Sequence, residues 1–115
     1  MLKEHLQMLV LLTIIKWVNT MNKELLKAPQ YCVFTFATTS YALKAERVLK
    51  AVDADFMVIP TLREISSSCG LSVKFLPDNL EEYASELNDH QVAIESVYRV
   101  KKNGHRNTVE KLELQ

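Results

Sequence analysis

The sequence predicts an α+β domain in which two helices pack on one antiparallel sheet. Short β-branched and aromatic runs, typical of strands, lie at 31–37, 56–59, 71–76 and about 92–101. Between them, apolar residues recur at three- and four-residue steps over 41–52 and 80–89, which indicates two amphipathic helices. The nearly balanced apolar and polar content of 115 residues fits one compact domain.

The first strand and helix have clear signals. Along 31–37 one predicted strand face carries Cys32, Phe34 and Phe36, and the other begins at Tyr31, so both faces are expected to be at least partly covered. Thr38-Thr39-Ser40 offers helix N-caps, and the helix is expected to end at 53–55.

The later elements are shorter. Pro60 stops the run at 56–59, and the run at 71–76 alternates apolar residues inward with Ser72 and Lys74 outward. Pro77-Asp78-Asn79 starts the second helix. Asn103-Gly104 is a hairpin signal, so 107–112 folds back as an edge strand or forms a frayed tail; we favour the tail.

The order β-α-β-β-α-β is that of a ferredoxin-like two-layer sandwich, with both helices on one sheet face. In this topology the end of the first strand and the loop between the second and third strands share one sheet edge. We therefore expect 38–40, 60–63 and 66–70 to converge there.

Charge and cysteine content exclude several classes. Lysines plus arginines and aspartates plus glutamates number 14 each, so no net charge favours nucleic acid or a membrane surface, and we expect neither as a partner. Cys32 and Cys69 lack CxxC spacing and a histidine companion, which argues against a zinc site and a disulfide scaffold. We expect a cytoplasmic protein without a metal or cofactor.

The chain divides into an N-terminal helical extension at 1–29, a domain at 30–101 and a C-terminal tail at 102–115. The apolar run at 9–15 is shorter than the roughly 20 residues that span a bilayer. We expect a helix at about 3–27 that packs on the domain or joins a second copy in a homodimer. The alternative is that translation starts at Met21.

The most reactive feature is Cys69 in the run Arg63-Glu64-Ile65-Ser66-Ser67-Ser68-Cys69-Gly70. At the predicted edge we expect its thiol to be exposed near a helix N-terminus and the Arg63 guanidinium, which favour the thiolate. Gly70 permits close approach or positive φ, and the serines offer donors to a small anion. The alternative is a buried cysteine in an ordinary loop. The candidate ligand-binding residues are Arg63, Ser66, Ser67, Ser68, Gly70, Thr38, Thr39 and Ser40.

Three motifs carry a family resemblance: Tyr-Cys-Val-Phe-Thr-Phe at 31–36, Ala-Leu-Lys-Ala-Glu at 42–46, and Ile59-Pro60 followed by the run at 63–71. With them the chain resembles the small bacterial family of selenium/sulfur carrier-like proteins over about 30–100. The run ending in Cys69-Gly70 is the specific part. Leu62 departs from the proline that many members have before the arginine.

The resemblance implies that Cys69 accepts sulfur or selenium as a persulfide or selenosulfide and passes it on. A cysteine desulfurase or sulfurtransferase-like protein would be the donor. In that scheme Arg63 and 38–40 hold the negative charge, and Gly70 gives access. The protein is then a carrier rather than a turnover enzyme. The alternative is a noncatalytic module that binds a small anion or a protein without thiol chemistry.

Overall fold

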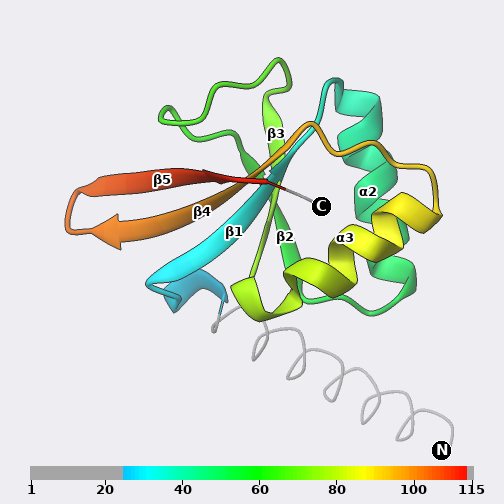
Figure 1. Ribbon diagram of the computed structural model, residues 1–115, viewed down its shortest axis with the longest axis horizontal. Helices are drawn as coiled ribbons and strands as arrows, with labels where there is room; N and C mark the ends of the chain where they lie inside the picture. The colour runs from blue at the N-terminus through cyan, green and yellow to red at the C-terminus, as the bar shows by residue number, and fades with distance from the viewer. Residues whose placement is uncertain (1–24, 114–115) are drawn as a thin grey trace, which may run out of the picture.

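Five antiparallel strands form one sheet in the computed structural model, which describes residues 25–113 (Figure 1). The elements in chain order are β1 (Gln30–Thr35), α2 (Thr39–Ala51), β2 (Phe56–Pro60), β3 (Leu71–Phe75), the 3₁₀ helix η1 (Pro77–Asn79), α3 (Leu80–Asp89), β4 (Ser96–Asn103) and β5 (Arg106–Leu112). The strand order is β2-β3-β1-β4-β5. The predicted α+β class is confirmed.

The sheet differs from the predicted four-stranded ferredoxin-like sandwich because β5 adds a fifth strand beside β4. Our preference for a frayed tail was therefore wrong. Asn103 pairs with Arg106 across a two-residue loop, and Gly104 takes the positive φ of 62° that such a tight hairpin needs at its first loop position. Pairing with β4, rather than its own apolar content, orders this polar strand.

Both helices begin and end with local signals that fix their lengths. Thr38 caps α2, and its hydroxyl accepts a hydrogen bond from the Tyr41 N–H at 3.3 Å. After α2, Asp53 takes a left-handed conformation while the Ala54 N–H bonds to the Leu49 carbonyl at 2.9 Å, which is a Schellman ending. Gln91 ends α3 in the same way.

The main core lies between the sheet and the two helices, which cover one face of the sheet (Figure 1). Phe34 of β1 and Phe75 of β3 are fully buried, with ring centroids 4.3 Å apart. The Tyr83 ring of α3 meets the Phe75 ring edge-on at 5.7 Å. The Tyr83 hydroxyl also accepts the Asp55 N–H at 2.8 Å, which ties α3 to the segment before β2.

The opposite sheet face, called the outer face below, carries a second cluster that includes Tyr31, Val33 and Tyr98. Ile65, from the loop between β2 and β3, packs on it. This cover explains why Lys74, predicted to point outward, is only 6% exposed and why Ser72 is fully buried.

The alternative translation start at Met21 and most of the predicted N-terminal helix at about 3–27 lie outside the described residues; within them, 25–27 are helical. Leu25 is fully buried. No helix among residues 25–113 has the length and apolar content that a bilayer crossing requires.

Candidate functional site

Three segments that are distant in sequence meet at one edge of the sheet, as predicted. The Thr39 hydroxyl, at the start of α2, lies 3.9 Å from the Cys69 Sγ. The Thr61 hydroxyl, just after β2, donates to the Cys69 carbonyl at 2.9 Å. Ser67 donates toward the Phe36 carbonyl at 3.5 Å, which links the loop to the end of β1. The predicted convergence is confirmed.

The loop between β2 and β3 is held closed from within and from the sheet. The Thr61 N–H bonds to the Gly70 carbonyl at 2.9 Å, which continues the pairing of β2 with β3 past the strand ends. The Thr61 hydroxyl also lies 2.7 Å from the Ser72 hydroxyl. Ile65, 5% exposed, anchors the loop on the outer face. The loop is therefore an ordered part of the fold.

The Cys69 side chain is 3% exposed and belongs to the core cluster on the helix side. Our expectation of an exposed thiol was wrong, because the Cys69 side chain packs into the core cluster between the sheet and the helices. Its sulfur is nevertheless not in a purely apolar setting. The Leu71 N–H points at the Sγ with an N···S distance of 3.4 Å, and the Thr39 hydroxyl is the second polar neighbour.

The Cys69 sulfur therefore has a backbone N–H donor beside it and lies near the start of α2. Thr38 uses its hydroxyl to cap the helix rather than to reach the thiol. Thr38 and Ser40 are exposed, and neither makes a hydrogen bond to Cys69.

The serines of the loop have different positions. Ser67 accepts the Cys69 N–H at 3.2 Å, and so fixes the backbone next to the thiol. Ser66 and Ser68 are exposed and make no hydrogen bond within the described part of the chain. Only Ser67 of the three is thus built into the closed site.

Arg63 and Gly70 do not have the expected roles in the closed loop. Arg63 is exposed and forms no hydrogen bond or ion pair with any residue in 25–113. Gly70 has no positive φ, and a Cβ placed there would meet nothing within 4 Å. Neither backbone conformation nor crowding therefore requires glycine at this position.

Sequence reasoning missed Glu95. Its carboxylate accepts a hydrogen bond from the Ser67 hydroxyl at 3.2 Å, and its N–H bonds to the Thr35 carbonyl at 2.8 Å. Glu95 therefore adds a carboxylate to the same edge of the sheet. No signal in the sequence identifies Glu95, because it lies in the irregular segment between α3 and β4, 28 residues from Ser67.

Cys32 fills the core on the helix side of the sheet. It is fully buried in the central strand β1, and burial raises the pKa of its thiol, while the charge and hydrogen bond of the neighbouring Arg99 guanidinium act in the opposite direction. Cys32 precedes Phe36 by four residues, roughly 13 Å along a strand. Because Phe36 marks the Cys69 edge, Cys32 is too remote to form a disulfide with Cys69.

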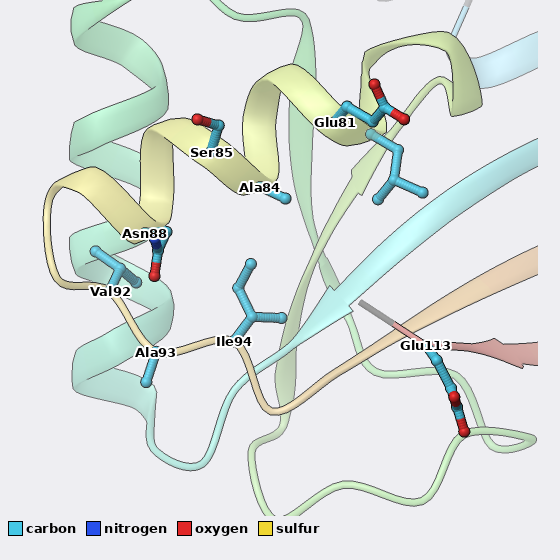
Figure 2. Close-up of a pocket in the computed structure, with 9 residues that line it drawn as sticks. Glu81, Ala84, Ser85, Asn88, Val92, Ala93, Ile94 and Glu113 are labelled. Carbon is cyan, nitrogen blue, oxygen red and sulfur yellow. The ribbon is translucent and has the colours of Figure 1, made fainter. Parts of the chain in front are cut away.

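A separate cavity of about 820 Å³ opens between α3, the segment 92–94 and the end of β5 (Figure 2). Figure 2 shows Ile94 pointing into it toward α3. Its lining residues are Leu80, Glu81, Ala84, Ser85, Asn88, Val92, Ala93, Ile94 and Glu113. Cys69 does not line this cavity, so the thiol and the cavity are distinct features.

Comparison with known proteins places these features in a family. The family model described as "Putative Se/S carrier protein-like" matches residues 31–99, more than half of the chain and the whole stretch from β1 through the Cys69 loop into β4. No curated protein and no solved structure matches. By the extent of this match, the chain belongs to the Se/S carrier protein-like family.

Proposed function

We propose that the protein is a carrier that accepts sulfur or selenium on Cys69, as a persulfide or selenosulfide, and passes it to a partner protein. The observation that carries this proposal is the Leu71 N–H aimed at the Cys69 Sγ at 3.4 Å, inside the region that matches the family. An N–H donor beside the sulfur can stabilise a group that gains negative charge.

The transfer step needs no oxidant. The Cys69 thiolate attacks the outer sulfur of a persulfide on a donor such as a cysteine desulfurase or sulfurtransferase-like protein. A new S–S bond forms on Cys69 while the S–S bond of the donor breaks, and the donor leaves as a thiolate. Delivery to an acceptor repeats the exchange in the other direction. A selenosulfide follows the same balance with selenium as the outer atom.

Access to Cys69 requires the loop between β2 and β3 to open. Arg63, Ser66, Ser68 and Gly70 are exposed on this loop, so they are placed to meet an approaching donor rather than to enclose the thiol. In our proposal Arg63 attracts the anionic persulfide, whereas Thr39 and Ser67 act on Cys69 itself. The carrier thus protects its thiol until a partner opens the loop.

Two further assignments belong to this proposal. We assign β1 to β4 to the ferredoxin-like class, supported by the order β2-β3-β1-β4 within the larger sheet. We also place the protein in a reducing bacterial cytoplasm, supported by the two free cysteines, in agreement with a thiol carrier.

Intact-mass measurement after incubation with a cysteine desulfurase and cysteine tests the proposal. Wild type and Cys32→Ser should gain the mass of one sulfur atom that a reductant removes, and Cys69→Ser should gain none. If wild type gains no mass, or if the Cys69→Ser variant gains the same mass, Cys69 is not a sulfur acceptor.

The burial of Cys69 at 3% exposure favours a second candidate, a noncatalytic binding module in which this cysteine only fills the core. In that case Cys69→Ala would keep every binding property of the protein. Sulfur loading therefore separates the two candidates. Loading of wild type that is lost in a folded Cys69→Ala variant supports the carrier, whereas the absence of loading in wild type supports the binding module.

A further inference from the structure

The outer face of the sheet places two lysines around one aromatic ring. Tyr31 lies in the central strand β1, and Lys74 of β3 and Lys102 of β4 approach it from the two neighbouring strands. The Lys74 Nζ lies 4.2 Å from the centroid of the Tyr31 ring, and the Lys102 Nζ lies 5.8 Å from it. Both ammonium groups are thus fixed near the same side chain.

Lys74 is unusual because it is only 6% exposed but has no anionic partner within residues 25–113. In this part of the chain its ammonium contacts the Tyr31 ring. The ion pairs of this part of the chain, Lys50–Glu46 and His90–Glu86, lie elsewhere on the helices. The Lys74 Nζ is not among the buried atoms without a hydrogen-bond partner in residues 25–113, so its apolar stem is enclosed while the ammonium reaches the surface, where an anion can contact it.

The two lysines also act on each other. Burial lowers the pKa of Lys74, and the positive charge of Lys102 lowers it further. Lys102 cannot easily turn away, because its Nζ donates to the Leu26 carbonyl at 3.2 Å and its backbone N–H to the Pro29 carbonyl at 2.9 Å. Repulsion between two held cations is relieved by an anion that contacts both.

We propose that a small oxyanion of the phosphate or sulfate class binds at Lys74 and Lys102 on the outer face. The Tyr31 ring covers one side of the Lys74 ammonium, so the N–H donors on its other sides remain available to an anion oxygen. This site is on the face opposite the Cys69 side chain and does not depend on the carrier function.

Glu64 limits which anions bind. It is exposed on the loop between β2 and β3, and together with burial its charge raises the pKa of the Tyr31 phenol. Its carboxylate is therefore close enough to repel an anion at this site, although it forms no ion pair with Lys74. Removal of this charge should strengthen binding.

The test is a titration of the full chain with inorganic phosphate or sulfate at constant ionic strength, in which backbone amide NMR shifts report binding. Wild type should show saturable shifts at Tyr31, Lys74 and Lys102. Lys74→Met keeps the apolar stem and should weaken binding about tenfold or more, since it removes a charge-assisted hydrogen bond. Lys101→Met is the matched control, because Lys101 is the exposed neighbour of Lys102 on the opposite face.

Lys102→Met is a second variant that should also weaken binding. It tests the proposal if Lys74→Met fails to fold. Glu64→Gln should strengthen binding. A parallel titration with glycerol phosphate distinguishes a free anion from a phosphate carried on a larger molecule, according to which binds more tightly. The proposal is overturned if wild type shows no saturable shifts, or if Lys101→Met weakens binding as much as the outer-face variants.

Discussion

Thr61→Val should open the Cys69 loop without breaking the core. The Thr61 hydroxyl makes two short contacts, to the Cys69 carbonyl at 2.9 Å and to the Ser72 hydroxyl at 2.7 Å. Valine has almost the same shape, so the substitution removes the hydroxyl and little else. The fully buried Ser72 hydroxyl then loses its hydrogen-bond partner, and so does the Cys69 carbonyl.

The size of the effect follows from these two contacts. Each hydrogen bond contributes about 0.5–1.5 kcal/mol net, so their loss should cost about 1–3 kcal/mol. Since both contacts hold the loop closed, this free energy is removed mainly from loop closure. Alkylation of Cys69 in the open state should then be faster by roughly 5- to 150-fold.

The assay is mass-resolved labelling with iodoacetamide at neutral pH. In wild type, Cys69 should react before Cys32, because opening one loop exposes Cys69, whereas Cys32 requires disruption of the central strand. Thr108→Val is the control, since this residue's hydroxyl accepts a hydrogen bond from Asn103 in the distant hairpin. Unchanged Cys69 labelling in a destabilised Thr61→Val variant would refute the reasoning.

Three further predictions concern single residues. Gly104→Ala should destabilise the protein by about 1 kcal/mol because of its φ of 62°, whereas Gly70→Ala should be neutral or slightly stabilising; denaturant titration of both variants checks the contrast. The raised pKa of Cys32 keeps its thiol protonated in the fold, so above about pH 8.5, where the unfolded thiol ionises, wild-type stability should fall more steeply than that of Cys32→Ala in paired melts. Arg63→Ala should slow sulfur loading severalfold at low salt but leave iodoacetamide labelling of Cys69 unchanged; equal loading rates would remove Arg63 from the site.

Local signals predicted most of the fold because they act within a few residues. Thr38 caps α2 as expected, and the helix ends at Ala51, just before the expected 53–55, because Asp53 adopts the left-handed conformation. The sequence analysis favoured a frayed tail over the strand at 106–112, although Asn103-Gly104 indicated a hairpin. Its residues are mostly polar, and only pairing with β4 makes them a strand, which is a tertiary effect.

The candidate site was predicted in position but not in exposure. Topology alone brings Cys69 and Thr39 to one edge, and their 3.9 Å contact agrees with that reasoning. Burial of the thiol comes from its packing in the helix-side core cluster, and the loop that carries it is held by Ile65 on the outer face and by the Thr61 hydroxyl; all of these are tertiary contacts. The pairing of Ser67 with Glu95 is likewise set by three-dimensional packing and has no signature in the sequence.

We expect the closed loop to be too tight for a loaded Cys69, so loading and opening should be coupled. A persulfide extends the side chain by an S–S bond of about 2 Å, beyond which the outer sulfur needs a full non-bonded distance to its neighbours. The Thr39 hydroxyl at 3.9 Å and the Leu71 nitrogen at 3.4 Å already lie near contact distance from the Sγ, and Cys69 is 3% exposed, so we expect the added atom to displace part of the loop. The loaded loop should therefore shift outward, and its exposed Ser66 and Ser68 mark the segment that would present the cargo. Hydrogen exchange should then be faster at 61–70 in the persulfide form than in the free thiol, with α3 unchanged as the internal reference. Equal exchange in both forms would mean that the core accommodates the added atom and that the loop does not control transfer.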